Sequence, residues 1–347
     1  MRALNLTAYN QLEIIEVEKP SIAEDEVLLR IEAVGICGSD VHGVDGSTGR
    51  RIPPIIMGHE AAGSIVEAGS RVASYSVGDR VTFDSTRYCG SCRFCRRGEV
   101  NFCENRRVFG VSCDEYTYQG AFAEYLAVPE RLLYRLPDGL SFEAGAMIEP
   151  LSIAVHAVDI TPISVGDKAL VFGAGIIGLL TMLVLKQAGC GRVVMADINP
   201  KRLDFARTLG ADLTVDTGSK DADAFLQQAS DGLGFECAFD AVGLEPTLTG
   251  AIGQLRKGGT VTVIGNFAPE IRLPLQQVVS RQIRIQGSNA SAGEYGACIE
   301  LLRSGRIDVE PLISARADLA EGAHWFEELS RKDTELLKVI LYPGVNR

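Results

Sequence analysis

The chain has 347 residues, of which 46% are hydrophobic and 23% are charged, and its formal net charge at pH 7 is −11. This composition is typical of a folded globular protein, and the length favours two domains over one. The negative charge, with no long basic cluster, argues against nucleic-acid binding, and no apolar stretch is long enough to span a membrane.

The first part of the chain shows short β-strand patterns. Val27, Leu29, Ile31 and Ala33 alternate with Leu28, Arg30 and Glu32, which is the period of two that is typical of a β-strand. Glycine and proline recur between such segments. We therefore predict an irregular β-barrel with long loops over residues 1–152.

The N-terminal residues and the cysteine content together predict a cytoplasmic protein. Residues 1–20 lack the apolar core of a signal peptide. Cysteines rarely form disulfides in a reducing cytosol, so clustered cysteines are expected to bind a metal ion. The scattered cysteines are expected to be small core residues, namely Cys113, Cys190, Cys237 and Cys298.

A cluster of four cysteines lies in a predicted loop lobe of about residues 85–113. Its members follow the pattern C-x2-C-x2-C-x7-C: Cys89, Cys92, Cys95 and Cys103. Four thiolates at this spacing can enclose one tetrahedral zinc ion with no open position, which is typical of a structural site. An iron–sulfur cluster and four unliganded thiols are the alternatives. We interpret the nearby pairs Arg96–Arg97 and Arg106–Arg107 as solvated loop charges.

From residue 153 onward, strand and helix patterns alternate. Strands are predicted over 169–172, 193–196, 237–240 and 260–264, and helices over 176–188 and from Pro200 onward. This alternation predicts an α/β fold with a doubly wound parallel sheet over residues 153–287. Residues 288–347 are expected to return to the first domain.

The predicted α/β domain contains a dinucleotide-binding fingerprint. The segment Gly173-Ala174-Gly175-Ile176-Ile177-Gly178 matches G-x-G-x-x-G between a predicted strand and a predicted helix. Its glycines allow a tight turn, and the helix N-terminus offers N–H groups to a pyrophosphate. A glycine turn that binds another ligand is the alternative.

Two charged residues after the next predicted strand bear on the choice of nucleotide. Asp197 ends that strand about twenty residues downstream, where a carboxylate can bind both ribose hydroxyls of adenosine. This predicts NAD rather than NADP, because a carboxylate would repel a 2′-phosphate. Arg202 lies nearby in the sequence, and its positive charge would instead favour the 2′-phosphate of NADP.

A second group of metal-binding residue types is spread over the first domain. Cys37 follows the predicted strand of residues 27–33, His59 and Glu60 come later, and Glu149 lies just before the predicted nucleotide domain. Together they supply a thiolate, an imidazole and two carboxylates near the predicted domain boundary, where ligands commonly bind.

The order and spacing of these motifs resemble the zinc-dependent medium-chain dehydrogenase/reductase family over nearly the whole chain. The matching segments are 37–40 (CGSD), 58–63 (GHEAAG), the four-cysteine lobe, 173–178 and 337–340 (LKVI). Within the family, residues 37–42 and 148–152 are most similar to the sorbitol (polyol) dehydrogenase branch. Ethanol-type members carry a cysteine where this chain has Glu149.

The resemblance implies a GroES-like barrel joined to a Rossmann domain, a catalytic zinc ion, and a dimer or tetramer. Carried over by position, Cys37, His59 and Glu60 are the zinc ligands, and Glu149 is a fourth ligand or binds the zinc-bound water. With the structural ion, two zinc ions per chain are expected. The implied reaction is oxidation of a secondary alcohol to a ketone, with hydride transfer to NAD.

Residues near Cys37 could move the alcohol proton. Ser39 can accept the proton, and His42 can pass it to solvent. The alternative for Ser39 is that it is only a turn residue, and the alternative for His42 is that it is only a surface loop residue. Asp40 is expected to orient His59. The other two histidines, His156 and His324, are interpreted as packing residues.

The predicted substrate is a polyol, a sugar or a sugar acid. Gly43 stands where sorbitol-type members carry an aromatic residue, and residues 288–291 stand where they carry an arginine and an aromatic residue. Candidate pocket residues are Phe109, Tyr116, Asn289 and Ser291.

Three other functions remain possible from the sequence. An L-threonine 3-dehydrogenase shares the metal motif. A catalytically inert zinc protein of this fold should lack Cys37 or His59, and both are present. A zinc-ribbon module for nucleic acid is disfavoured by the net charge.

Overall fold

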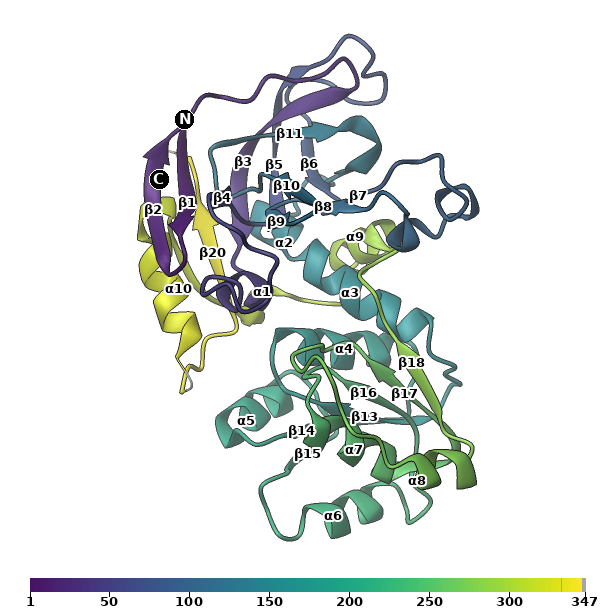
Figure 1. Cartoon of the computed structure of the whole chain (residues 1–347). Helices are drawn as coiled ribbons and strands as arrows, with labels where there is room; N and C mark the ends of the chain where they lie inside the picture. The colour runs from purple at the N-terminus through teal and green to yellow at the C-terminus, as the bar shows by residue number, and fades with distance from the viewer. Residues whose placement is uncertain (332, 345–347) are drawn as a thin grey trace. The chain divides into compact units, whose positions relative to one another are not determined.

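The computed structural model describes residues 1–331 and 333–344, and it divides into two compact units (Figure 1). The terminal unit comprises Met1–Glu149 and Ala292–Arg347, and the central unit comprises Pro150–Ser291. These limits lie close to the predicted ones at residues 152 and 287.

The main sheet of the terminal unit has seven strands within the described residues. Its order is β12-β6-β5-β3-β20-β19, and β11 also pairs with β3. The strands are β3 (Glu26–Gly35), β5 (Glu60–Ala68), β6 (Arg80–Phe83), β11 (Tyr125–Pro129), β12 (Leu133–Arg135), β19 (Ile313–Asp318) and β20 (Lys338–Tyr342).

The burial of β3 follows the alternation of residues 27–33 at Arg30, which is exposed, and at Glu32, which is half-buried, but not at Leu28. Val27, Leu28 and Leu29 are all fully buried. Within the sheet, β3 pairs with β5 along its length and with β11 and β20 along its two halves, so it lies in the middle of the sheet.

Smaller elements complete the terminal unit. The minor sheets contain β1 (Arg2–Ala8), β2 (Gln11–Glu16), β4 (Ile55–Ile56), β7 (Thr86–Arg87), β8 (Arg107–Val108), β9 (Val111–Cys113) and β10 (Tyr116–Tyr118). The α-helices are α1 (Gly38–Val41), α2 (Phe142–Ala146), α9 (Tyr295–Arg303) and α10 (Gly322–Ser330). Helix α3 (Ile148–Asp159) begins in this unit and continues in the central unit from Pro150. Short 3₁₀ helices cover Cys95–Arg97, Val100–Phe102, Glu130–Leu132, Glu310–Leu312 and Leu319–Glu321.

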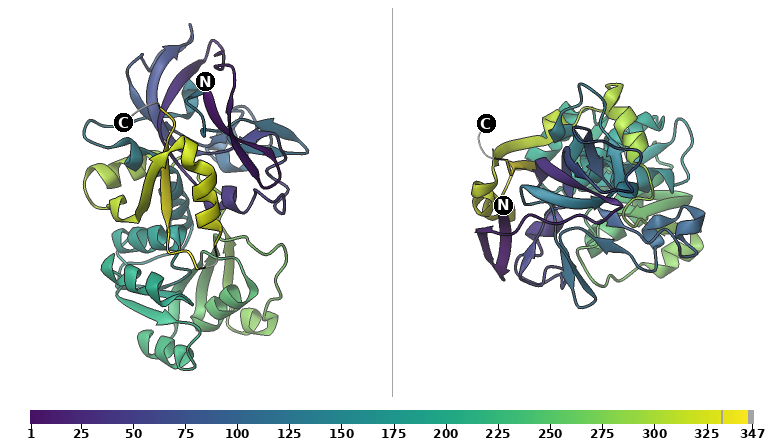
Figure 2. Two further views of the ribbon diagram at one scale, coloured as in Figure 1. Left: turned by 90° about the vertical axis from the view of Figure 1, so that its left-hand side faces the viewer. Right: turned by 90° about the horizontal axis from the view of Figure 1, so that it is seen from above.

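The core of the terminal unit joins the two ends of the chain. Leu4 and Leu6 from β1 share one buried cluster with Val34 from β3, Phe326 from α10 and Leu341 from β20. In Figure 2 the C-terminal strand and helix, in yellow, lie against the purple N-terminal strands of this unit. The last part of the chain is thus required for the fold of the first part.

The central unit is a parallel sheet of six strands within the described residues, in the order β15-β14-β13-β16-β17-β18. Numbered along the chain, this is the order 3-2-1-4-5-6 of a doubly wound nucleotide-binding fold. The strands are β13 (Lys168–Phe172), β14 (Arg192–Asp197), β15 (Leu213–Asp216), β16 (Phe235–Asp240), β17 (Leu255–Val263) and β18 (Arg284–Gly287). The helices are α4 (Ile176–Gln187), α5 (Pro200–Thr208), α6 (Ala222–Ala229), α7 (Glu245–Gln254) and α8 (Leu275–Ser280).

The predicted doubly wound fold is confirmed, and the local signals explain where its helices begin. Pro200 is the first residue of α5, and the Asn199 side chain accepts hydrogen bonds from the backbone N–H groups of Lys201 (3.0 Å) and Arg202 (3.4 Å). These contacts satisfy N–H groups that an uncapped helix leaves free. In the described part of the chain, no helix is both long and apolar enough to cross a membrane.

Candidate active site and metal sites

Three of the predicted zinc ligands meet at the edge of the main sheet of the terminal unit. Cys37 precedes α1, His59 precedes β5, and Glu60 is the first residue of β5. Because β3 and β5 are antiparallel neighbours with Gly35 opposite Glu60, the end of one strand meets the start of the other. One donor atom from each of the three residues lies within 4.8 Å of the others.

A buried lysine compensates the charge of Glu60. Lys338 of β20 is fully buried, and its Nζ donates hydrogen bonds to Glu60 Oε2 and to the Ile36 carbonyl (3.1 Å). Burial disfavours the ammonium form, but the negative charges of Glu60 and Cys37 outweigh it and raise the pKa of Lys338. A Cβ atom on Gly35 would lie 2.4 Å from Glu60 Oε2, so glycine is needed there.

His59 is surrounded by negative groups. Its Nδ1 lies 3.5 Å from Asp40 Oδ2, as expected for a carboxylate that orients a ligand histidine. Burial alone would lower the pKa of His59, because it disfavours the charged imidazolium form. The negative charges of Asp40, Cys37 and Glu149 have the larger effect, and they raise the pKa of His59 to about 10. This excess of negative charge is the environment that a metal cation would neutralise.

Glu149 approaches the same region from α3. Its Oε1 accepts a hydrogen bond from Ser85 Oγ at 2.9 Å, and the Ser85 backbone N–H donates to the Tyr295 hydroxyl at 3.3 Å. Among the described residues, Glu149 is not part of the group whose donor atoms lie within 4.8 Å of one another. Burial raises the pKa of Glu149.

Asp84 is a buried carboxyl group beside this network. Its Oδ1 accepts the Thr86 N–H at 2.8 Å, and its Oδ2 has no hydrogen-bond partner among the residues that the structure describes. Burial raises the pKa of Asp84 to about 7.

We expect Asp84→Asn to stabilise the protein more at pH 8 than at pH 5. Between the ordinary aspartate pKa of 3.8 and the raised pKa of about 7, the unfolded state releases this proton and the folded state keeps it, so stability falls as pH rises through this window. Each unit by which the pKa of Asp84 is raised corresponds to about 1.4 kcal/mol of stability lost at high pH, and an asparagine, which does not ionise, avoids this loss. Thermal unfolding of both proteins at the two pH values tests this. The control is Asp138→Asn, at an exposed position, and its unfolding temperature should differ from that of the wild type by the same amount at both pH values. The same result for Asp84→Asn would contradict the raised pKa of Asp84.

The predicted proton-transfer residues lie on or beside α1. Ser39 is exposed, and its hydroxyl donates to Cys37 Sγ at 3.3 Å. His42 is exposed at the C-terminal end of the same helix. The geometry therefore joins Ser39 to the metal-binding group and leaves His42 open to solvent.

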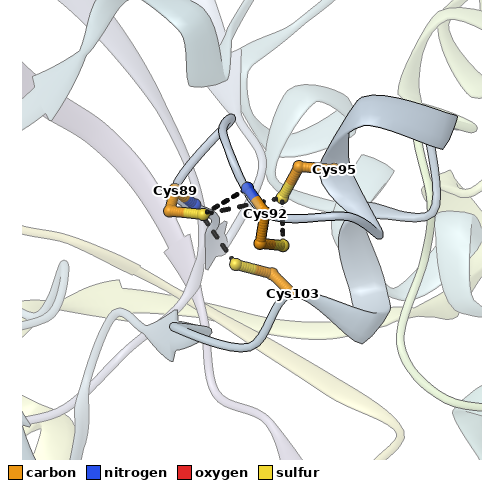
Figure 3. Close-up of side chains that lie close together, drawn as sticks. All are labelled: Cys89, Cys92, Cys95 and Cys103. Carbon is orange, nitrogen blue, oxygen red and sulfur yellow. Dashed lines mark hydrogen bonds between the residues drawn. The ribbon is translucent and has the colours of Figure 1, made fainter.

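The four cysteines of the lobe converge as predicted (Figure 3). Their sulfur atoms all lie within 4.8 Å of one another, with 3.5 Å between Cys92 and Cys95 and 4.0 Å between Cys89 and Cys95. A tetrahedral zinc ion with Zn–S bonds of about 2.3 Å requires separations of about 3.8 Å. The donor set of the lobe thus fits a zinc ion.

Backbone N–H groups also point at these sulfur atoms. Cys89 Sγ accepts from Cys92 N–H at 3.3 Å, and Cys103 Sγ accepts from Cys89 N–H at 3.2 Å. Hydrogen bonds from Ser91 lower the pKa of Cys89 to about 5, whereas burial raises the pKa of Cys95 to about 12. A metal cation would remove this difference, because it binds all four groups as thiolates.

The glycine fingerprint forms the predicted turn between β13 and α4. Gly173 has φ +96°, and a Cβ atom on Gly178 would lie 1.8 Å from the Gly173 carbonyl oxygen, so both positions require glycine. A Cβ atom on Gly175 would meet open space, which leaves room beside the turn for a ligand. Ile176 and Ile177 begin α4 and are half-buried.

Asp197 lies beside this turn, at the end of β14. Its Oδ2 accepts the Ala174 N–H at 2.6 Å, and its Oδ1 accepts the Asn199 N–H at 2.8 Å. A carboxylate oxygen has a second lone pair, so both oxygens can still accept ribose hydroxyls. Arg202 lies in the first turn of α5 and is half-buried.

Some secondary predictions need correction. Phe109 cannot line an accessible pocket, because it is fully buried between Phe83 and Tyr118, with ring centroids 5.1 Å from each. Arg106 and Arg107 are half-buried rather than solvated, and Arg107 lies 4.6 Å from the ring of Tyr116.

Among the scattered packing residues, Cys237 and Cys298 are buried, whereas Cys113 and Cys190 are half-buried. His156 is buried in α3, as predicted. His324 lies on the exposed side of α10 with its ring 5.3 Å from that of Trp325.

Lys338, Arg51 and Ser85 belong to this site but were not predicted from the sequence. A lysine that directly precedes the apolar run Val339–Leu341 was a signal for Lys338, because such a residue is rarely buried without a partner. Arg51 and Ser85 lie in polar segments, and nothing in their local sequence marks them.

Comparisons with known proteins agree with this architecture. The family model "Alcohol dehydrogenase GroES-like domain" matches residues 23–138, and "Zinc-binding dehydrogenase" matches residues 177–304. The chain is 31% identical over 348 residues to sorbitol dehydrogenase of Bacillus subtilis (strain 168), covering 99% of this chain and 98% of that protein. It is 37% identical over 304 residues to L-idonate 5-dehydrogenase of Vitis vinifera, covering 86% and 82%.

Solved structures of similar chains contain nicotinamide nucleotides. A zinc-binding dehydrogenase from Sinorhizobium meliloti 1021 bound to NADP has a TM-score of 0.89 and 29% identity, covering 99% of each chain. The short chain alcohol dehydrogenase rspB from E. coli CFT073, complexed with NADH, has a TM-score of 0.90 and 30% identity, also covering 99% of each chain.

Proposed function

Because this chain belongs to the zinc-dependent medium-chain dehydrogenase/reductase family, in its polyol dehydrogenase branch, we propose that it oxidises a secondary alcohol of a polyol, sugar or sugar acid to a ketone and transfers the hydride to NAD. The observation that carries the proposal is the convergence of Cys37, His59 and Glu60 within 4.8 Å. An inert relative would have no reason to keep this group complete.

We propose that Cys37, His59 and Glu60 hold the catalytic zinc ion. When bound, zinc supplies Lewis-acid stabilisation of negative charge on the substrate oxygen. Glu149 lies outside the direct ligand set in this proposal, since Ser85 holds one of its oxygens. Its carboxylate adds negative charge beside the site. The four-cysteine lobe holds the second, structural zinc ion.

In this proposal, residues in and beside α1 remove the proton of the substrate alcohol. Ser39 accepts the proton of the substrate alcohol, and His42, which is exposed at the end of α1, passes it to solvent. Asp40 keeps the His59 ring in place through the 3.5 Å contact with Nδ1. The nicotinamide, when bound, supplies the hydride acceptor.

NAD is the proposed cofactor because of Asp197. We expect Asp197→Ser to lower kcat/KM for NAD relative to NADP by roughly 10- to 100-fold, since a hydrogen bond to a charged group is worth about 1.5–3 kcal/mol. Initial rates with both nucleotides test this. Asp204→Ser, on exposed α5, is the control and should leave the ratio unchanged. An unchanged ratio in a folded Asp197→Ser protein would remove Asp197 from this role.

The substrate class rests on the polyol and sugar-acid names of the relatives and on the two carboxylates of the site, which suit a substrate with several hydroxyls. NADH formation across a panel of polyols, sugars, sugar acids and L-threonine tests it, with zinc-loaded protein. We expect turnover with at least one polyol or sugar acid. Turnover of threonine alone would instead identify a threonine dehydrogenase, and no turnover with either nucleotide would refute the proposal.

Self-association and location remain predictions. A homodimer or homotetramer is supported by apolar side chains that remain exposed on α8 and β18, namely Leu275, Val279 and Ile285. The edge strand β18 pairs on one side only among the described residues. We propose a cytoplasmic location on the cysteine content of the sequence.

A further inference from the structure

Arg51 is a buried arginine directly behind the predicted metal site. Only 3% of its surface is exposed. Its Nε and Nη2 donate to the same oxygen, Asp40 Oδ1, at 3.1 and 2.8 Å. Its Nη2 also lies 3.4 Å from Ser39 Oγ, and its Nη1 donates to the Arg50 carbonyl at 2.9 Å. One guanidinium therefore contacts two residues to which the proposed function assigns roles.

The backbone around Arg51 is fixed to the neighbouring strand β9. Arg51 forms a β-bridge with Ser112, and the flanking Ile52 N–H donates to the Ser112 carbonyl at 3.0 Å. The Ser112 N–H donates to the Arg50 carbonyl at 3.2 Å. The side chain thus starts from a held position, and its guanidinium can hold other groups in turn.

Stability alone does not explain this ion pair. Asp40 is fully buried, so both charges are removed from water, and a buried ion pair adds little net stability compared with apolar residues of similar size. What the pair does provide is geometry, because two N–H groups on one oxygen hold that oxygen of the carboxylate in place.

That geometry is passed on to His59. With Oδ1 held by Arg51, the other oxygen, Oδ2, faces His59 Nδ1 at 3.5 Å. Neither Oδ2 nor Nδ1 has another hydrogen-bond partner among the described residues. A carboxylate that receives Nδ1–H fixes the tautomer of a ligand histidine and leaves Nε2 for the metal.

Gly43 provides the space for this arrangement. A Cβ atom on Gly43 would lie 2.3 Å from Arg51 Cγ and 3.2 Å from Arg51 Cβ. A larger side chain at position 43 would therefore displace Arg51 from Asp40. The small residue at 43 and the arginine at 51 form a matched pair.

We propose that Arg51 is a positioning residue of the active site, which orients His59 through Asp40 and orients the Ser39 hydroxyl directly. The inference rests on the proposed function for the roles of His59 and Ser39. Ser39 Oγ receives an N–H from Arg51 and directs its own hydrogen to Cys37 Sγ. Arg51 thereby connects the metal ligands with the proton acceptor.

The first experiment compares Arg51→Met, Arg51→Lys and the exposed neighbour Arg50→Met. Affinity for zinc is measured by chelator competition, and the Co²⁺-substituted enzyme gives a visible spectrum that reports ligand geometry. We expect Arg51→Met to weaken binding of the catalytic-site metal by roughly 10- to 100-fold and to alter the Co²⁺ spectrum. The variant should also have a lower kcat, with little change in the KM for NAD. The lobe zinc should remain. Arg51→Lys should restore part of the loss, and Arg50→Met should resemble the wild type.

The second experiment displaces the Arg51 side chain with a substitution at the neighbouring position 43, so that the arginine itself stays in the protein. Gly43→Ala should weaken metal binding strongly in the wild-type background, because the new Cβ would lie 2.3 Å from Arg51 Cγ, and much less in an Arg51→Ala background, where only the looser contacts at 3.1 Å with the Ser39 carbonyl and 3.2 Å with Cβ of residue 51 remain. Wild-type metal affinity and Co²⁺ spectrum in Arg51→Met would overturn the proposal, as would equal effects of Gly43→Ala in both backgrounds. Metal binding and spectrum need no substrate, so failure of the substrate panel would not affect this test.

Discussion

Cys37→Ser is expected to abolish turnover while NADH binding persists. Cys37 supplies the only thiolate of the group that also contains His59 and Glu60. A hydroxyl binds zinc far more weakly than a thiolate does, and the metal contributes several kcal/mol to stabilising charge in the transition state. Since about 1.4 kcal/mol corresponds to tenfold in rate, kcat/KM should fall by roughly 10³-fold or more.

Three measurements separate this result from misfolding. Metal analysis should show two zinc ions per wild-type chain and one per Cys37→Ser chain. NADH fluorescence titration should give an unchanged Kd, because the glycine fingerprint lies in the central unit. Cys190→Ser, a half-buried cysteine outside both metal-binding groups, is the matched control and should keep both ions and full activity. Two zinc ions and near-normal turnover in Cys37→Ser would show that the catalytic metal lies elsewhere.

Cys103→Ser is expected to lose the lobe zinc and to destabilise the terminal unit. Among the described residues, the segment between Cys89 and Cys103 has two short 3₁₀ helices and no strand, and several of its backbone N–H groups donate to the sulfur atoms. Structural zinc sites in small domains contribute about 10–16 kcal/mol of apparent binding energy. Even part of this, at about 2–4 °C per kcal/mol for a domain of 150–250 residues, should lower Tm by ~10 °C or more.

Hydrogen exchange locates the effect. We expect protection to fall within residues 85–113 and to remain in the central unit. Cys113→Ser, which lies outside both metal-binding groups of the described residues, is the control and should keep the Tm and both ions. A visible absorption band in the wild type, lost in Cys103→Ser, would indicate an iron–sulfur cluster instead of zinc. Normal protection in a Cys103→Ser chain that holds only one zinc ion would show that the lobe needs no metal for its order, and two zinc ions in that chain would show that the metal is held without Cys103.

The sequence predicted the elements whose signals are local. The glycines of 173–178 were predictable because a tight turn and a close approach of backbone each require a residue without Cβ. The four cysteines lie within fifteen residues or so of one another, so their spacing limits the geometries they can reach. In both cases the structure brings together the predicted residues.

The catalytic group was harder to predict from the residues themselves. Cys37 follows β3 and Glu60 begins β5, and it was the family resemblance that brought them together. The structure supplies the physical reason, because the antiparallel pairing of β3 and β5 sets Gly35 opposite Glu60. Glu149 was placed by the same resemblance, and its contact with Ser85 could not be foreseen because the two residues are separated by several strands.

By itself the sequence determined the fold class, the nucleotide turn and the cysteine lobe, since each depends on residues close together in the chain. Only the tertiary structure decided how the charges around the metal site are compensated. Lys338 reaches Glu60 from the last strand, and Arg51 reaches Asp40 through space that Gly43 leaves open. Buried charges need partners because water is absent, and which partner arrives depends on how distant strands pack.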